Sequence, residues 1–328
     1  PKPAKITFSQ IASKYLEIHS EEHDQPNTFR QKFFVLNSFV NFLEEDKAAE
    51  DVTPEDIQDY LHARKKVNDG DENFIKRYPN MLKSKKANGA KTANRDLRIL
   101  NSLYSWCIRQ AFFTYNPCAG IPKYPEDPTP RYVPSIADMS KVRLAASGEW
   151  SDLIECLYHT AGRLSEILTL KWSDVDFYSN TLTLYTRKRR GGQKQADKLA
   201  MTKQLKSIIE SRKRKRNKED VYVFQNPKRE IGHYVKEDVR DVMSNLCAKA
   251  EVKPFGFHAI RHHVSAILAN TGRVSLREIQ YYLRHQRPTT TDTYLRGLTP
   301  DMDNITNVLD ELATLPQAVA EESKSGSN

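Results

Sequence analysis

With 328 residues the chain is long enough for two domains, and its 51 Lys and Arg against 42 Asp and Glu give a formal net charge of +9. This balance, with a pI near 9.2, favours a polyanionic partner, nucleic acid before membrane. The four cysteines are far apart and include no C-x-x-C pair, which disfavours a disulfide framework or a zinc ribbon and fits the reducing cytosol.

Membrane insertion is not expected, because no apolar run approaches the roughly 18 residues of a transmembrane helix and no signal peptide opens the sequence. We therefore expect a cytoplasmic protein. The first residue is Pro1 rather than Met, which is compatible with a fragment or a processed product.

Residues 7–113 predict an all-helical unit, because their apolar positions recur at helical spacing. Thr53 before Pro54 reads as an N-cap followed by a proline at the first helical position. Residues 66–89 are polar and predict a loop, and a helix over 90–112 follows. The apolar positions that we expect to face inward are Phe8, Ile11, Ala12, Tyr15, Leu16, Phe29, Phe33, Leu36, Phe39, Val40, Leu43, Leu97, Leu100, Leu103, Tyr104 and Cys107.

A basic cluster lies at the approach and in the first turns of the helix predicted over 90–112. It could be a solvated face, but with the net charge we favour contact with a phosphate backbone. The candidate DNA-binding residues of this cluster are Lys83, Lys85, Lys86, Lys91, Arg95 and Arg98.

Six prolines between 117 and 134 mark a domain boundary, because proline at that density cannot continue a helix and stiffens an extended connection. We assign residues 1–121 to a helical domain and 122–134 to a proline-rich linker. Residues 135–315 form a second domain with a C-terminal helix, and 316–328 are a polar tail that we expect to be disordered.

The second domain opens with helical signals over 135–146 and 151–160. Arg163 follows a glycine and precedes an amphipathic helix. Its guanidinium could form an ordinary ion pair with Glu166 three residues on, or it could reach forward to a bound anion.

A β-hairpin follows, because residues 181–186 alternate with β-branched side chains and 198–201 can form the return strand. Lys188 then lies at or near the tip, where a lysine could act as a mobile proton donor. Its neighbours Arg187, Arg189 and Arg190 are candidate DNA contacts. A helix from about 202 ends in a basic run, 212–216, which suits a nuclear-localisation-like patch, DNA contact or solubility.

The stretch from His258 to Tyr294 gathers the remaining candidates. Apolar residues at helical spacing predict a helix over 258–271, on which His258 and Arg261 share one face. A proton carrier beside a permanent cation suits a site that handles phosphate. A second apolar run, 276–283, leads to His285, and a threonine-rich turn delivers Tyr294 nine residues later.

These motifs occur in a recognisable order. R-x-S-E-x-L-x-L-x-W at 163–172, the hairpin lysine, H-x-x-R-H at 258–262, L-x-H at 283–285 and the later tyrosine together resemble the catalytic domain of tyrosine site-specific recombinases of the phage and genomic-island integrase type. The resemblance covers about 130–300. It implies a mainly α fold with a small antiparallel β-sheet, in which an all-helical core-binding domain precedes a mixed α/β catalytic domain.

The resemblance also implies roles for individual residues. Arg163 and Arg261 would clamp the phosphate, Lys188 would be the hairpin lysine, and Glu166 would orient or support the first arginine. His258 would be the first histidine, His285 would occupy a position held by His or Trp, and Tyr294 would be the nucleophile.

Two positions depart from the family pattern. The family usually has Gly two places before the first arginine, whereas Ala161-Gly162 reverses that order. It usually has Leu-Gly-His where this chain has Leu283-Arg284-His285. The second departure adds a cation near the site, so Arg284 joins the candidate DNA-binding residues.

The implied reaction cleaves DNA through a 3′-phosphotyrosine and rejoins it, so that mobile DNA is integrated or excised in the cytoplasm, at the bacterial nucleoid. Such chemistry needs no cofactor, ATP or metal. Its partners would be double-stranded attachment or core sites and possible DNA-bending accessory proteins. Because strand exchange needs two duplexes, we expect four protomers on DNA. A helix over 305–312 could cover its own core or dock on a neighbouring protomer.

Three alternatives stay open: a type IB topoisomerase, a catalytically idle DNA-binding regulator, and a chromosome-dimer-resolving recombinase. A zinc site at His258 and His262 is disfavoured, because no glutamate follows His258 as H-E-x-x-H requires and no cysteine is near. His262 and His263 are expected to pack or to face DNA.

Overall fold

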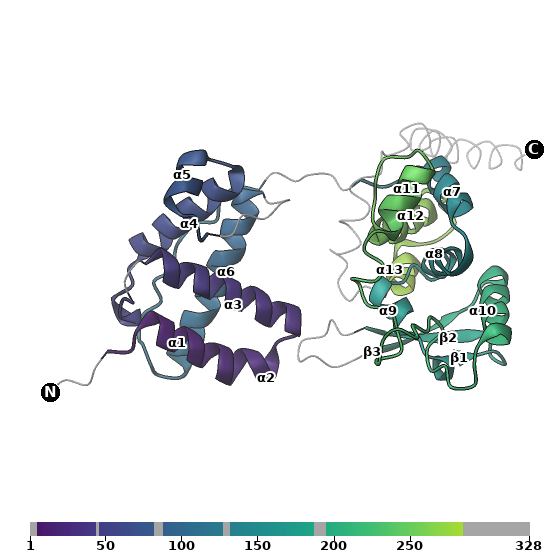
Figure 1. Ribbon diagram of the computed structural model, residues 1–328, viewed down its shortest axis with the longest axis horizontal. Helices are drawn as coiled ribbons and strands as arrows, with labels where there is room; N and C mark the ends of the chain where they lie inside the picture. Colours follow the sequence, from purple (N-terminus) through teal and green to yellow (C-terminus); the bar gives the residue numbers. More distant parts are fainter. Residues whose placement is uncertain (1–4, 44–45, 82–87, 127–131, 187–194, 285–328) are drawn as a thin grey trace, which may run out of the picture. The chain divides into compact units, whose positions relative to one another are not determined.

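The computed structural model describes residues 5–43, 46–81, 88–126, 132–186 and 195–284. These residues form two compact units, and the boundary between them falls within the proline-rich segment (Figure 1). Within the described part of the chain, no helix combines the length and apolar character of a membrane span.

The first unit is all helical. It contains α1 (Phe8–Tyr15), a π-helical turn (Leu16–Ser20), α2 (Glu21–His23), α3 (Pro26–Phe42), a 3₁₀ turn (Ala49–Asp51), α4 (Pro54–Asp69), α5 (Glu72–Arg77) and α6 (Gly89–Arg109). The predicted start of α4 is confirmed, because Thr53 and Asp56 form a reciprocal capping box around Pro54. The helix predicted over 90–112 is confirmed as α6, whose expected inward positions are all buried.

The loop predicted over 66–89 is wrong in part, since α4 continues to Asp69 and α5 follows. The Asp71 side chain accepts hydrogen bonds from the backbone N–H groups of Asn73 and Phe74, which caps α5. Phe33, expected inside, is 46% exposed. It therefore lies outside the face of α3 that Leu36 and Phe39 bury.

A buried ion pair joins α4 to α6. The Asp96 carboxylate has no exposed surface, and it accepts hydrogen bonds from Arg64 Nε at 2.7 Å and Tyr60 Oη at 3.1 Å. Arg95 binds the other carboxylate oxygen at 2.9 Å. This cluster fixes how the two helices pack.

The second unit is mixed. It contains α7 (Ile136–Ala145), α8 (Gly148–Thr160), α9 (Leu164–Leu168), a 3₁₀ turn (Trp172–Asp174), β1 (Val175–Asp176), β2 (Thr181–Thr186), β3 (Gln195–Ala200), α10 (Lys203–Lys215), α11 (Val242–Lys249), α12 (Phe257–Asn270) and α13 (Leu276–Tyr282). The three strands form one antiparallel sheet in the order β1-β2-β3. The expected fold class, mainly α with a small antiparallel sheet, is confirmed.

The predicted hairpin is confirmed as β2 and β3, with Leu182 opposite Leu199 in the register. The return strand begins earlier than predicted, at Gln195, and Met201 lies just beyond it. Leu182 and Leu184 enter the core of the unit, which fixes the face that β2 presents. The amphipathic helix predicted after Arg163 is α9, which ends at Leu168.

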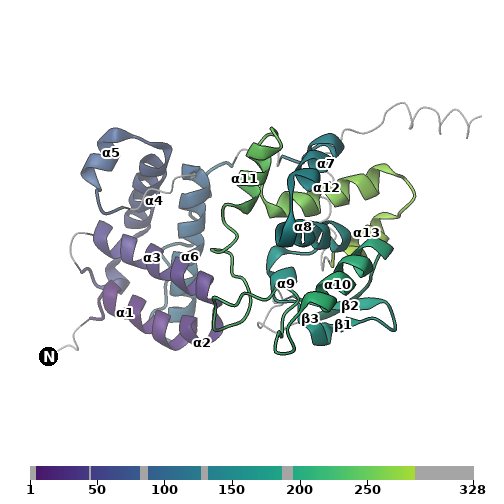
Figure 2. The same cartoon turned by 45° about the vertical axis from the view of Figure 1, so that its right-hand side comes forward.

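The helices that carry the later motifs match their predictions. The helix expected over 258–271 is α12, and α13 follows it after a turn at Gly272. α12 packs against α8 and α13, as both views show (Figures 1 and 2). The end of α8, the start of α12 and the end of α13 therefore meet around one point.

We expect Asp96→Ala to lower the free energy of unfolding of the first unit by about 3–5 kcal/mol, because it removes the carboxylate that compensates a buried guanidinium. Urea unfolding of the whole chain, with hydrogen exchange of α4 and α6, measures this. Glu50→Ala is the control: its pair with Lys5, at 3.0 Å, is exposed, and the loss should stay below about 1 kcal/mol. Equal losses would contradict the assignment.

Candidate active site

The turn between α8 and α9 presents Arg163. Ala161 ends α8 in the left-handed conformation, with φ 45°, and Arg163 is extended at the N-cap of α9. Gly162 lies so close to its surroundings that an added Cβ would be 2.8 Å from Thr160 Oγ1 and 3.0 Å from Ile167 Cδ1. The reversed Ala-Gly order is therefore accommodated by a strained alanine followed by a glycine that has no room for a side chain.

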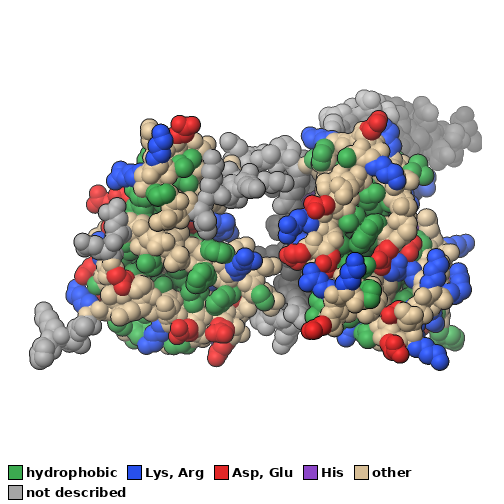
Figure 3. Space-filling view, in the orientation of Figure 1, with side chains coloured by type: hydrophobic (Ala, Val, Ile, Leu, Met, Phe, Trp, Pro, Cys, Tyr) green, Lys and Arg blue, Asp and Glu red, His purple; other side chains and the backbone are tan. Residues whose placement is uncertain are grey.

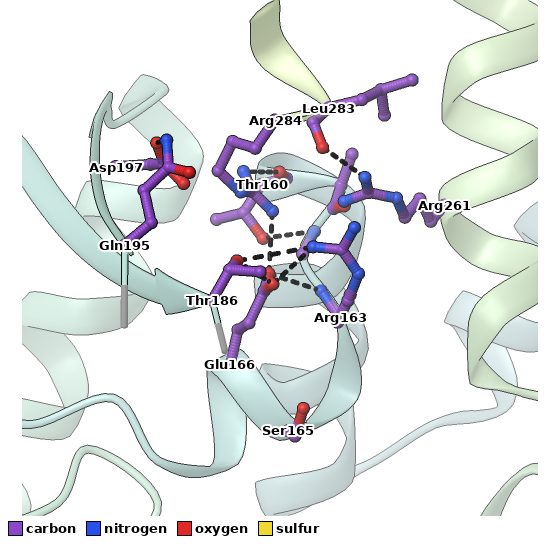
Figure 4. Close-up of polar contacts among 12 residues, drawn as sticks. Thr160, Arg163, Ser165, Glu166, Thr186, Gln195, Asp197, Arg261, Leu283 and Arg284 are labelled. Atoms are coloured by element: carbon purple, nitrogen blue, oxygen red, sulfur yellow. Dashed lines mark hydrogen bonds and ion pairs between the residues drawn. The ribbon is translucent and has the colours of Figure 1, made fainter. Parts of the chain in front are cut away.

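Glu166 is the centre of the polar contacts at this turn, and it is only 4% exposed (Figure 4). Oε1 accepts from Arg163 Nη1 at 2.7 Å and from Thr186 Oγ1 at 2.6 Å. Oε2 accepts from the Arg163 backbone N–H at 2.9 Å and from Arg284 Nη2 at 2.9 Å. One carboxylate therefore joins the start of α9, the end of β2 and the end of α13.

The Glu166 carboxylate is strongly acidic. Burial by itself raises the pKa of Glu166, but the Arg284 guanidinium, the Arg163 backbone N–H, the Thr186 hydroxyl and the Arg163 charge together lower that pKa to about 2. Glu166 is therefore ionised at any working pH, and it acts as a fixed acceptor rather than as a proton carrier.

Arg261 reaches the same turn from α12. It is 1% exposed, and its Nη1 donates to the Ala161 carbonyl oxygen at 2.6 Å, while Nη2 donates to the Leu283 carbonyl oxygen (Figure 4). Two carbonyls from different segments thus orient the guanidinium. The side chain of Arg163, by comparison, is 19% exposed.

His258 lies one turn before Arg261 on α12 and is exposed. Its ring meets that of His262 edge to face, with centroids 4.6 Å apart. It also borders a groove of about 860 Å³ that Ser165 of α9 lines. The turn between α8 and α9 that carries Arg163, the start of α12 and this groove belong to one region of the second unit.

His262 and His263 are both buried, which fits packing. Burial lowers the pKa of His263, and its Nδ1 lies 2.8 Å from the Pro134 carbonyl oxygen. Among the described residues, no group of three or more His, Cys, Asp or Glu side chains is placed to hold a metal ion.

The described residues bring Arg163, Glu166 and Arg261 together, with His258 one helical turn away. Several predicted site residues lie outside the described residues: Lys83, Lys85, Lys86, Lys188, His285, Tyr294, Arg187, Arg189 and Arg190. Thr186 and Arg284, two partners of Glu166, are the last described residues before the segments of Lys188 and of His285.

The structure also reports on the other candidate DNA contacts. Lys91 and Arg98 are exposed on α6, whereas Arg95 is engaged with Asp96. Arg284 was expected to contact DNA, but its side chain is 3% exposed and paired with Glu166, so it is not presented to a partner. Sequence reasoning missed this contact, and its one signal was the departure from the family's glycine.

The basic run at the end of α10 is partly structural. Arg212 pairs with Glu149 at 2.8 Å and with Asp152 at 2.9 Å. Figure 3 shows Lys and Arg side chains gathered over α10, with acidic side chains nearby. None of the three interpretations of this run describes Arg212, because this residue anchors α10 to α8.

Two arginines therefore converge from separate segments beside a buried carboxylate, in a mainly helical unit with a three-stranded sheet, and this arrangement suits the binding of an anion. Residues 133–299 match the model of the phage integrase family. The match spans half of the chain, so the protein belongs to this family and is a tyrosine recombinase.

The chain is similar to two tyrosine recombinases of the XerC type. The XerC-like protein of Caldanaerobacter subterraneus subsp. tengcongensis is 24% identical over 279 residues, covering 73% of this chain and 70% of that protein. XerC of Bacillus pumilus is 25% identical over 222 residues, covering 62% of this chain and 70% of that protein.

Solved structures share the fold. The Tn1549 transposon integrase in complex with circular intermediate DNA has a TM-score of 0.67 and 18% identity, covering 92% of this chain and 99% of that one. A lambda integrase dimer bound to a COC′ core site has a TM-score of 0.67 and 18% identity, covering 90% and 80%.

We expect Gly162→Ala to lower the free energy of unfolding by about 1–3 kcal/mol, because the added methyl overpacks against Thr160, whose hydroxyl is already bound to the Cys156 carbonyl oxygen at 2.6 Å. Thermal unfolding measures the loss. Ala161→Gly is the matched control: relief of the positive φ and loss of a buried methyl offset one another, so the change should stay below about 1 kcal/mol. The reverse ranking would contradict the geometry of this turn.

Glu166→Gln should lower the free energy of unfolding at pH 7 by about 3 kcal/mol, which corresponds to a pKa depressed from 4.5 to about 2. The stabilisation is complete above about pH 4.5 and is lost as the pH falls toward 2. The difference in free energy of unfolding between wild type and variant, measured with urea, should therefore shrink as the pH falls from about 4.5 to about 2. The exposed Glu219→Gln should change stability by less than about 0.5 kcal/mol. A difference that does not vary with pH would rule out the buried carboxylate as its source.

Proposed function

We propose that this recombinase is site-specific, cleaving and rejoining DNA strands through Tyr294 so that mobile DNA is integrated or excised. The observation that carries the proposal is the meeting of Arg163 and Arg261 at one turn, beside an ionised Glu166. Two permanent cations at one place suit an anionic substrate whose transition state gains negative charge.

The proposed chemistry is a transesterification. The Tyr294 oxygen bonds to the phosphorus while the bond from phosphorus to the 5′ oxygen breaks. The tyrosine proton passes to His258, and Lys188 protonates the departing 5′ oxygen, which leaves as a 5′ hydroxyl. A 5′ hydroxyl from another strand then reverses these steps. Because the phosphotyrosine conserves the energy of the broken bond, the reaction consumes no nucleotide cofactor.

Fixed orientation of the arginines supports this role. Each guanidinium is planar and permanently charged, so a guanidinium that protein acceptors already orient contributes a fixed positive charge at the phosphate site without reorganisation. Glu166 holds Arg163, and the carbonyl oxygens of Ala161 and Leu283 hold Arg261. Binding energy is then not spent on ordering these side chains.

We further propose that the helical unit clamps duplex DNA and that four protomers act on two duplexes. Exposed Lys91 and Arg98 on α6, together with the net charge of +9, support phosphate contact. The solved Tn1549 and lambda integrases, whose fold this chain shares, were bound to circular intermediate DNA and to a core site.

Chromosome-dimer resolution is the second candidate, and the relatives named XerC favour it. Plasmid assays separate the two. Recombination between two different attachment sites supports integration of mobile DNA, whereas recombination confined to identical direct repeats supports resolution. Relaxation of a plasmid that lacks any specific site would instead indicate topoisomerase activity.

We expect wild-type protein to form a denaturant-resistant adduct with a nicked suicide substrate of its cognate site, because the cleaved fragment diffuses away and religation fails. Tyr294→Phe should form none, since it lacks the attacking oxygen. Denaturing gels measure the adduct. Tyr281→Phe, at a position on α13 that is 81% exposed, should react like wild type.

An adduct in the Tyr294→Phe variant would mean that another tyrosine is the nucleophile. Intact binding to the cognate site with no adduct in any variant would indicate a catalytically idle DNA-binding protein.

A further inference from the structure

Arg284 occupies an unfavourable backbone position at the end of α13. Its φ is 55°, in the left-handed region that costs an ordinary residue roughly 1 kcal/mol or more and that glycine adopts freely. Glycine is also what the family pattern leads one to expect here. A long cationic side chain in this place therefore needs an interaction that offsets the strain.

Among the described residues, Arg284 donates hydrogen bonds to acceptors inside the second unit. Its Nη2 donates to Glu166 Oε2 at 2.9 Å, and its Nη1 donates to the carbonyl oxygens of Thr160 at 3.3 Å and Tyr282 at 3.2 Å (Figure 4). The side chain is 3% exposed, as is that of Glu166. Arg284 thus fastens the end of α13 to the turn that carries Arg163.

The balance of charge shows what this contact achieves. Glu166 alone would neutralise Arg163, and a neutral pair attracts a phosphate weakly. With Arg284, one carboxylate is shared by two guanidinium groups, and the cluster keeps one net positive charge. The two carboxylate oxygens accept from different donors: Oε2 accepts from Arg284 and the Arg163 backbone N–H, while Oε1 accepts from the Arg163 side chain.

We infer that Arg284 is a positioning residue of the recombinase, which acts through Glu166 to orient Arg163 and to preserve its positive charge for the DNA phosphate. This inference rests on the proposed function. Burial raises the pKa of Glu166 and has the largest effect on it. The Arg284 charge has the next largest effect, and it lowers that pKa.

Arg284→Gly tests the inference without imposing a new strain, because glycine accepts the positive φ. With the suicide substrate at saturating concentration, we expect the single-turnover cleavage rate to fall about 10- to 100-fold while the DNA dissociation constant changes less than about threefold. Arg284→Lys, which restores the charge without the planar fork, should recover part of the rate. Circular dichroism and thermal unfolding check that each variant is folded.

Arg277→Ala is the matched control, since Arg277 is exposed on α13 and its loss removes the same charge. Its cleavage rate should equal that of wild type. A double-mutant cycle with Glu166→Gln then asks whether Arg284 acts through Glu166. If it does, Arg284→Gly should change the rate less than about threefold in the Glu166→Gln background.

Three results would overturn the inference: an Arg284→Gly variant that cleaves at the wild-type rate, one that loses DNA affinity but not rate, or a cycle in which the two effects multiply. In each case wild type still forms the adduct, so the proposed function stands. If wild type forms no adduct on a cognate site that it binds, the proposed function fails, and the inference fails with it.

Discussion

The second unit depends at its centre on one buried carboxylate. Glu166 accepts hydrogen bonds from the start of α9, the end of β2 and the end of α13, three segments that are far apart in the sequence. A buried carboxylate is costly unless each oxygen is satisfied, and here both are. All three segments must therefore pack around Glu166 in the folded state, and this packing sets the position of Arg163.

Arg261 fixes the same region from another direction. Its guanidinium donates to the carbonyl oxygens of Ala161 and Leu283, which are the C-terminal caps of α8 and α13. Carbonyls at helix ends need donors from elsewhere, and a buried arginine can supply several at once. The residues that resemble a phosphate clamp thus also hold the fold together, so the stability of this region and its capacity to bind an anion are linked.

Periodicity predicted most elements because their local signals and their burial agree. The cap at Thr53, the alternation over 181–186 and the apolar face of α12 each give one answer, and the structure has α4, β2 and α12 there. α5 was missed because its six residues are too few to show a helical period, although Phe74 and Ile75 pack against the core and Asp71 caps its start. Phe33 was misplaced because a helix with apolar residues on several faces does not specify which of them faces the core.

The sequence by itself determined the family, the mainly helical class and the residue types at each motif position, because these depend on order and spacing along the chain. Only the tertiary structure decided what Arg284 does. On the sequence it was a further cation beside the predicted site, whereas in the fold it is buried against Glu166. The difference arises because residues 166 and 284 meet only after α8, α12 and α13 have packed, and no local pattern encodes that meeting.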